Sequence, residues 1–285
     1  MLIHKIKEVQ EIVKDWKNKN LKIGIIPTMG ALHEGHASLI KKAVETCDKV
    51  IVSVFVNPIQ FGPSEDFDKY PRTLEADEEL ANSIGADIVF APSADEMYGT
   101  GQRLSNDTLC YVVPPFFYVD KLCGKSRIGH FDGVCTVVLK LFNITQADYG
   151  FFGQKDALQL IILRKMVNDL NVPIELISCP IVRDENGLAL SSRNKYLNEN
   201  DKKDALALNK ILNNIKACYA KGITDTSVLK ETAFQFLNEN HDLEYWEFVN
   251  KNDLEEQTTA NNDTLVLIAC RVNSIRLIDN MLLND

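Results

Sequence analysis

Two apolar segments with an amphipathic segment between them constrain the fold of this chain most. Residues 21–29 (LKIGIIPTM) and 49–56 (KVIVSVFV) are rich in β-branched residues and apolar almost throughout, which is typical of parallel strands covered on both faces. Between them, apolar side chains in residues 35–47 recur at helical spacing, with charged side chains on the opposite side. This order predicts a βαβ unit with a right-handed crossover.

The alternation of helix and strand continues along the chain. An acidic helix is predicted to end at Gly85, because glycine is favoured just after a helix. The segments that follow read as strand 86–90, helix 133–146, strand 148–152, helix 156–170 and strand 174–178. They predict an α/β fold with a doubly wound, mostly parallel, open sheet. Such a sheet binds ligands beyond the carboxyl ends of its strands, near the point where strand order reverses.

The regular alternation of helices and strands ends near residue 180. A turn-rich segment, 182–194, precedes a long polar helix predicted to close at Gly222. Residues 243–250, 264–272 and 274–283 then read as strands. We therefore expect two domains, residues 1–180 and a smaller α+β domain of residues 181–285.

Charge and composition exclude several classes of protein. A net charge of −9 disfavours a general nucleic-acid surface, which needs a concentrated basic field. The N-terminal residues interleave Lys and Glu with apolar residues, unlike a signal peptide or membrane anchor. The 7 cysteines are scattered without a CxxC pair, which favours reduced thiols over disulfides or a zinc site. We expect a cytoplasmic protein with no nucleic-acid or membrane partner.

The join between the first apolar strand and its helix, PTMGALHEGH, carries two histidines. Backbone N–H groups at a helix start lack helical partners and favour an anion. His33 and His36 are three residues apart, so both can face one phosphate, and Gly35 leaves room for it. A simpler alternative is that one histidine caps the turn and the other lies in solvent, which an isolated HxxH pattern favours.

Three further polar groups occur at strand ends or turns. Asn57 and Gln60 follow the second strand in a Pro-rich loop suited to a hydroxylated substrate. Lys155 stands beside a helix start, with Gln159 one turn further on. Residues 188–194 (LALSSRN) combine two hydroxyls and an arginine, as a triphosphate site does. Each alone could equally be a polar loop, a surface lysine or a serine-rich turn.

Taken together and in this order, five stretches resemble the pantothenate synthetases, the pantoate–β-alanine ligase family. They are PTMGALHEGH, VSVFVNPIQFGPSEDFDKYPRT, GHFDGVCTVVLKLFNI, FFGQKDALQL and GLALSSRN, between residues 27 and 194. HEGH is similar to the HxGH signature of the wider nucleotidyltransferase superfamily, whose histidines meet ATP phosphates.

The resemblance implies a fold and a reaction. The expected fold is a Rossmann-like N-terminal domain that binds ATP and pantoate, with a smaller C-terminal lid, usually in a homodimer. The expected reaction condenses pantoate with β-alanine, using ATP and Mg²⁺, and yields pantothenate, AMP and pyrophosphate. A pantoate carboxylate oxygen attacks the α-phosphorus of ATP, and the amine of β-alanine then displaces AMP from pantoyl adenylate.

The resemblance also assigns residues. His36 matches the proton donor, with His33, Lys155 and Arg193 acting on the phosphates. Gln60 and Gln159 match the pair that binds pantoate, with Asn57 in the same wall. The residues matched to the ATP site are Met29, Gly30, Ala31, Leu32, His33, Glu34, Gly35, His36, Gly153, Gln154, Lys155, Asp156, Val182, Leu190, Ser191, Ser192 and Arg193. The Mg²⁺ ligands stay unassigned.

Three positions depart from the common family pattern. Ile128 stands where relatives have Pro, Leu158 where they have Gln, and Gln154 where they have Glu. None of them removes a residue assigned above.

Two competing functions stay open at this point. A nucleotidyl transferase for a phosphorylated acceptor would need an additional basic pocket, whereas Gln60 and Gln159 are neutral. A non-catalytic nucleotide-binding regulator would not require the two histidines, Lys155 and the SSRN cluster together.

Overall fold

The computed structural model describes residues 1–63, 65–99 and 108–284. The chain divides into two compact units, each with its own core. The first comprises Met1–Gly153 and Leu158–Cys179, and the second comprises Gln154–Ala157 and Pro180–Asp285. The boundary expected from the sequence lay after residue 180, with residues 154–157 assigned to the first domain. In the structure these four residues group with the second unit.

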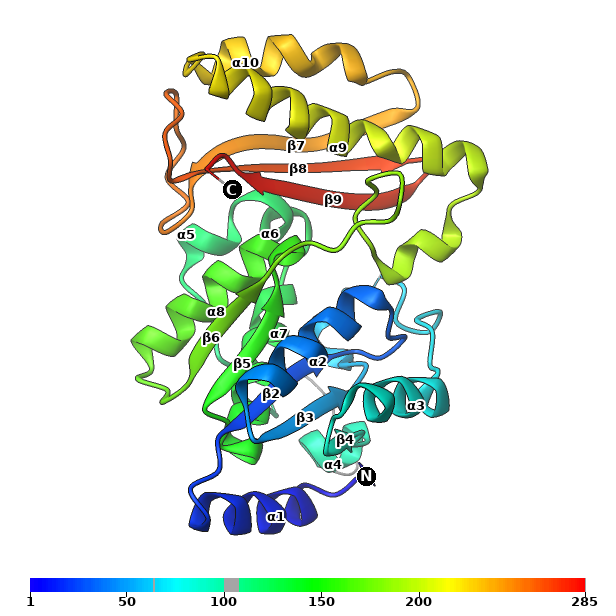
Figure 1. Cartoon of the computed structure of the whole chain (residues 1–285), viewed down its shortest axis with the longest axis vertical. Helices are drawn as coiled ribbons and strands as arrows, with labels where there is room; N and C mark the ends of the chain where they lie inside the picture. The colour runs from blue at the N-terminus through cyan, green and yellow to red at the C-terminus, as the bar shows by residue number, and fades with distance from the viewer. Residues whose placement is uncertain (64, 100–107, 285) are drawn as a thin grey trace. The chain divides into compact units, whose positions relative to one another are not determined.

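The first unit is built on a six-stranded parallel sheet (Figure 1). Its strand order is β1-β4-β3-β2-β5-β6. The strands are β1 (Leu2–Ile3), β2 (Ile23–Thr28), β3 (Lys49–Val54), β4 (Ile88–Phe90), β5 (Tyr149–Gly153) and β6 (Glu175–Cys179). The predicted α/β fold with a Rossmann-like sheet is confirmed. The edge strand β1 was not predicted, because two residues give no periodicity.

Burial explains why the strands of this sheet are continuously apolar. Strands β2 and β3 pair in register from Ile23 opposite Lys49 to Thr28 opposite Val54. Successive side chains of a strand point to opposite faces, and Ile25 and Ile26 of β2 are both fully buried. Strands covered on both faces leave no solvent side that would favour polar residues.

Helices flank the sheet and connect its strands. They are α1 (Ile6–Asn18), α2 (Glu34–Thr46), α3 (Leu74–Ile84), α4 (Ala94–Tyr98), α5 (Phe116–Val119), α6 (Leu122–Ser126), α7 (His130–Thr145) and α8 (Ala157–Asp169). Two short 3₁₀ turns are η1 (Pro58–Gln60) and η2 (Gln154–Asp156). Helix α3 ends as predicted, since Gly85 adopts the left-handed conformation with φ of 114°.

The strand order reverses between β2 and β5. From β2 the chain moves to β3 and β4 in one direction, while β5 and β6 lie on the other side of β2. The loops that follow Thr28 and Gly153 leave the sheet at this reversal, where open α/β sheets bind ligands. The motif PTMGALHEGH therefore starts at the predicted kind of position.

The second unit is a three-stranded antiparallel sheet with helices (Figure 1). Its strands are β7 (His241–Asn250), β8 (Thr264–Val272) and β9 (Ile275–Leu282), in that spatial order. Its helices are η3 (Ser192–Tyr196), α9 (Glu199–Ala220), α10 (Thr226–Ala233) and η4 (Phe234–Phe236). Apolar residues of α9, such as Ile211 and Leu212, share one core with Trp246 and Ile268 of the sheet. The predicted small α+β unit is confirmed.

The seven cysteines all lie in the described part of the chain, and none of them forms a disulfide. Burial raises the pKa of Cys135 to about 12 and that of Cys270 to about 11, with nearby carboxylates acting in the same direction. These two thiols therefore stay protonated at neutral pH and pack as small apolar groups. Among the described helices, none combines the length and the apolar character needed to span a membrane.

Candidate active site

The loop after β2 is fixed by a buried carboxylate. Gly30 has φ of +84°, and a Cβ there would lie 2.9 Å from Oδ2 of Asp77, so the position requires glycine. Asp77 is 2% exposed and accepts the N–H groups of Ala31 (3.0 Å) and Leu32 (2.7 Å). The sequence analysis missed Asp77, because it is one of several acidic residues in α3 and its loop partners are distant in sequence.

Both histidines of the motif cap the start of α2. His33 Nδ1 accepts the N–H of Gly35 (3.1 Å), and His36 Nδ1 accepts the N–H of His33 (3.3 Å). The ring centroids lie 4.2 Å apart. The alternative in which only one histidine caps the turn is therefore wrong. Because Nδ1 is an acceptor in both rings, a neutral imidazole carries its proton on Nε2. The helix start thus holds two Nε2–H donors beside the backbone N–H groups of its first turn.

A chain of side-chain hydrogen bonds sets the orientation of Gln60. Asn57 Nδ2 donates to Gln60 Oε1 (3.0 Å) and to the carbonyl of Gly133 (3.2 Å). Gln60 Nε2 in turn donates to the sulfur of Met29 (3.0 Å), a weak acceptor. Gln60 therefore presents amide donors beside the loop that leads to His33. Asn57, predicted as part of the substrate wall, is 1% exposed and orients Gln60.

Tyr98 completes this series of hydrogen bonds, and the sequence analysis did not predict its role. Its hydroxyl donates to Asn57 Oδ1 over 2.7 Å. Burial raises the pKa of Tyr98, and Tyr111 adds to the rise, so the phenol remains a donor at neutral pH. The direction of every hydrogen bond from Tyr98 to Gln60 is then determined. Tyr98 ends the short helix α4, far from Asn57 in sequence, and no local pattern indicates the contact.

His130 and Arg127 hold the main chain of the same turn. His130 Nδ1 lies 2.8 Å from the carbonyl of Gln60, and its Nε2 lies 2.8 Å from Nη1 of Arg127. Since a guanidinium only donates, Nε2 accepts and Nδ1–H donates to Gln60. Arg127 also pairs with both carboxylate oxygens of Glu65 (2.7 and 2.8 Å). Burial alone would raise the pKa of Glu65, but the hydrogen bond and charge of Arg127 outweigh it and lower that pKa.

The departures from the family pattern do not disturb these contacts. Ile128 is 92% exposed and leaves the Arg127–His130 pair intact. Leu158 is 4% exposed and belongs to the buried apolar residues. Gln154 hydrogen-bonds through its side chain to Oδ1 of Asn280 (3.5 Å).

Gly133 brings α7 against the backbone of the Asn57–Gln60 turn. A Cβ at this position would lie 2.4 Å from the carbonyl oxygen of Ile59 and 2.7 Å from the Gln60 nitrogen. Both groups are backbone and cannot rotate away, unlike the end of a flexible side chain. The close approach of the turn to α7 therefore requires glycine at position 133.

Gly133→Ala is expected to lower the free energy of unfolding by about 1–3 kcal/mol, the usual cost of overpacking. Alanine would gain about 1 kcal/mol of helix propensity, but the backbone clash outweighs it. Urea denaturation of both proteins measures the difference. Gly62→Ala is the matched control, because its Cβ would meet only Glu65, with Cγ at 3.8 Å. Equal stability of the Gly133→Ala variant and the native protein would contradict the close packing.

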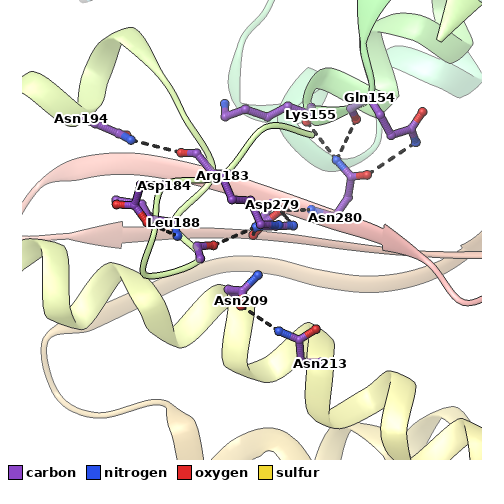
Figure 2. Close-up of polar contacts among 12 residues, drawn as sticks. Gln154, Lys155, Arg183, Asp184, Leu188, Asn194, Asn209, Asn213, Asp279 and Asn280 are labelled. Atoms are coloured by element: carbon purple, nitrogen blue, oxygen red, sulfur yellow. Dashed lines mark hydrogen bonds and ion pairs between the residues drawn. The ribbon is translucent and has the colours of Figure 1, made fainter. Parts of the chain in front are cut away.

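The loop with Lys155 lies in the second unit. Gln154–Asp156 form η2, and Lys155 extends its side chain away from Asn280, which contacts the main chain of the loop (Figure 2). Gln159 follows in α8 and is half-buried. Within the described part of the chain, Gln159 and Gln60 are not hydrogen-bonded to each other, so the predicted pantoate pair stays a prediction.

The SSRN segment follows a narrow hairpin of the second unit. The N–H of Leu190 donates to the carbonyl of Val182 (2.9 Å), and Asp184 and Leu188 are hydrogen-bonded across the turn. Ser191 Oγ then accepts the N–H of Arg193 (3.3 Å) and starts η3. Ser191 therefore caps a short helix, which leaves Ser192 and Arg193 in its first turn.

The predicted site residues are thus distributed over both units. The first unit carries Met29–His36, Asn57, Gln60, Gly153 and Gln159, and the second carries Gln154–Asp156, Val182 and Leu190–Arg193. The structure brings together His33 with His36, and Met29 with Gln60 and Asn57. In the described ranges, no cluster of three or more His, Cys, Asp or Glu side chains could hold a metal ion.

Comparison with known proteins identifies the family. The model of the family described as pantoate-beta-alanine ligase matches residues 1–282. The chain belongs to this ligase family. A pantothenate synthetase of Clostridium novyi is 50% identical over 282 residues, covering 98% of this chain and 97% of the relative. One of Caldicellulosiruptor saccharolyticus is 47% identical over 283 residues, covering 99% and 98%.

Solved structures of the ligase family have the same fold. A crystal structure of pantothenate synthetase from Thermus thermophilus superposes with a TM-score of 0.92 at 34% identity, covering 100% of this chain and 99% of that one. A pantoate-beta-alanine ligase from Francisella tularensis, complexed with beta-gamma ATP and beta-alanine, gives a TM-score of 0.80 at 35% identity. The match covers 100% of this chain and 98% of the Francisella chain.

Proposed function

We propose that this chain condenses pantoate with β-alanine at the expense of ATP, through a pantoyl adenylate, to give pantothenate, AMP and pyrophosphate. Family membership over residues 1–282 carries the proposal. The paired histidines at a helix start, where strand order reverses, supply the anion-binding geometry that the first half-reaction needs. The Francisella tularensis ligase is complexed with beta-gamma ATP and beta-alanine, and we assign ATP and β-alanine as the corresponding substrates here.

The first half-reaction places growing negative charge on the phosphates. When the pantoate carboxylate attacks the α-phosphorus, pyrophosphate leaves and carries that charge. We assign the Nε2–H groups of His33 and His36, the ammonium of Lys155 and the guanidinium of Arg193 to stabilise it by fixed electrostatics. The resemblance also assigns His36 as a proton donor to the leaving phosphate, a role that requires the imidazolium form, in which Nδ1 is protonated and no longer accepts the N–H of His33. No covalent enzyme intermediate is required.

The ATP site of the proposal includes the full set predicted from the sequence. It consists of Met29, Gly30, Ala31, Leu32, His33, Glu34, Gly35, His36, Gly153, Gln154, Lys155, Asp156, Val182, Leu190, Ser191, Ser192 and Arg193. Backbone N–H groups of the first segment and hydroxyls of the last suit phosphate oxygens.

Neutral amides suit the other substrate. Pantoate carries hydroxyl groups, which the amides of Gln60 and Gln159 can bind without a competing charge. The donors of Gln60 are already oriented by Asn57 and Tyr98, so little ordering is needed when pantoate binds.

The proposal has four further parts. The reaction uses Mg²⁺, the enzyme is a cytoplasmic homodimer, and the second unit closes during the reaction. Mg²⁺ usually binds through substrate phosphates, water and one or two carboxylates, which is compatible with a described chain that has no dedicated acidic cluster. Bound there, Mg²⁺ would neutralise part of the phosphate charge. Closure would shield pantoyl adenylate from hydrolysis.

Pyrophosphate exchange tests the proposal. Labelled pyrophosphate should enter ATP when the enzyme, Mg²⁺ and pantoate are present without β-alanine, and the exchange should stop when pantoate is omitted. A nucleotidyl transferase for phosphorylated acceptors would ignore pantoate, and a nucleotide-binding regulator would show no exchange. Addition of β-alanine should convert the intermediate to equal amounts of pantothenate and AMP.

Tyr98→Phe is expected to raise the KM for pantoate about 5- to 10-fold while changing the KM for ATP little. Loss of the hydroxyl leaves the buried Oδ1 of Asn57 without its donor, a cost of about 1–1.5 kcal/mol, and allows the Gln60 amide to turn. Steady-state kinetics with each substrate varied in turn measures the two constants. Tyr149→Phe serves as the control, since Tyr149 lies in β5 and packs against the apolar core. An unchanged pantoate KM would exclude Tyr98 from orienting Gln60.

A further inference from the structure

Asn280 of β9 fixes the main chain at Lys155. Asn280 is 2% exposed, and its Nδ2 donates to the carbonyls of both Gln154 and Lys155, each over 2.9 Å (Figure 2). An amide nitrogen has two N–H groups, and here both bind consecutive carbonyls of one loop. The position of the Lys155 backbone is therefore set relative to β9.

The preceding residue of β9 fixes the hairpin before the SSRN segment. Asp279 is 4% exposed and accepts Nη1 and Nη2 of Arg183 over 2.6 and 2.9 Å. Arg183 Nη1 also donates to the carbonyl of Gly187 (3.2 Å), across the turn. The N–H of Asn280 donates to Oδ1 of Asp279 (2.8 Å), which links the two contacts.

We propose that Asp279 and Asn280 are positioning residues for ATP: adjacent on one strand, they hold the Lys155 loop and the 182–193 segment in a fixed register. This inference rests on the proposed function, which assigns Lys155, Ser191, Ser192 and Arg193 to the phosphates. Their side chains bind Arg183 and the carbonyls of residues 154 and 155, and we do not assign them to the phosphates. They act through the main chain of the loops that carry those groups.

The polar character of these two buried side chains favours a positioning role over a role in packing alone. A buried amide and a buried carboxylate each require hydrogen-bond partners for their polar atoms. A pair of apolar side chains could fill the same space without such partners. Satisfied polar networks hold their members in one arrangement. Phosphate stabilisation needs that arrangement, because a displacement of about 1 Å can cost about 100-fold in rate.

Asn280→Asp tests the inference with nearly the same shape. The carboxylate has no N–H to donate and faces two carbonyl oxygens, so the loop should shift. We expect the Kd for ATP, measured by calorimetric titration, to rise about 10-fold, the effect of roughly one or two lost hydrogen bonds. The pantoate concentration for half-maximal exchange should stay within about twofold of its native value, because positioning through Lys155 concerns the phosphates. Asn250→Asp is the matched control, since Asn250 Oδ1 accepts the N–H of Asn252 and an aspartate can do the same.

A double-mutant cycle separates positioning from a general structural role. If Asn280 acts through Lys155, Asn280→Asp should weaken ATP binding less than about twofold further in a Lys155→Met background. A purely structural role would produce the full loss in both backgrounds and would overturn the inference. Asn280→Ala, checked by urea denaturation, replaces Asn280→Asp if the latter does not fold.

The outcomes distinguish this inference from the proposed function. Native protein that binds ATP without pantoate-dependent exchange would remove the ligase function, while the ATP titrations would still decide the role of Asn280. Normal exchange together with unchanged ATP affinity in Asn280→Asp and Asn280→Ala would overturn the inference alone. Native protein with no affinity for ATP would overturn both.

Discussion

Replacing Lys155 by methionine is expected to lower the rate of pantoate-dependent pyrophosphate exchange by about 100- to 1,000-fold, the scale of one lost electrostatic donor in a transition state. Methionine keeps an unbranched stem of similar length and removes only the ammonium. The Lys155 main chain would stay in place, because Asn280 binds the carbonyls of residues 154 and 155. The exchange rate at saturating ATP and pantoate is the quantity to compare.

A lysine on the helix that follows provides the control for that comparison. Lys165 lies on α8 and pairs with Asp169 at 2.6 Å on the surface, where such pairs contribute little. Lys165→Met should therefore leave exchange within about twofold of the native rate. Near-normal exchange in Lys155→Met would place Lys155 outside the phosphate site and would overturn the assignment of its loop.

Replacing His36 by asparagine is expected to lower the adenylation rate by about 100-fold or more while the fold stays intact. Asparagine can still accept the N–H of His33, as His36 Nδ1 does over 3.3 Å. It lacks the distal donor that corresponds to Nε2–H. Single-turnover formation of AMP, together with urea denaturation, separates the chemical loss from any loss of stability.

His36→Gln is the informative partner of this variant, because glutamine places an amide N–H near the position of Nε2. If hydrogen bonding to the phosphate is the main contribution of His36, glutamine should recover part of the rate that asparagine loses. Equal loss in both variants would mean that proton donation dominates. Near-normal turnover in His36→Asn would exclude His36 from either role.

The regular elements were predictable because local patterns determine them. The isoleucines of residues 23–26 are fully buried in the sheet, and a strand of a parallel sheet explains so continuous an apolar run. Gly85 ends α3 in the left-handed conformation that glycine tolerates best. The helix predicted from the apolar spacing of residues 35–47 is present as α2, Glu34–Thr46. By contrast, α10 was missed, although Asp225 caps its first N–H groups.

The partners of the site residues could not be predicted in the same way. Asp77, Tyr98 and Asn280 contact their loops across 46, 41 and 125 positions in the chain. No periodicity connects residues so far apart, since their proximity follows from the assembled sheets. The sequence therefore predicted that His33 and His36 can face one phosphate, but not that the Nδ1 atoms of both rings cap the helix.

The assignment of residues 154–157 to the second unit has a consequence for the connectivity of the polypeptide. The backbone passes from one unit to the other at three junctions, after Gly153, after Ala157 and after Cys179. A single cut after Cys179 would leave η2 on a fragment that lacks β9, and would leave Asn280 without the carbonyls it binds. Gene fusion or recombination at one breakpoint cannot exchange these units as complete modules. The two units must therefore be inherited together.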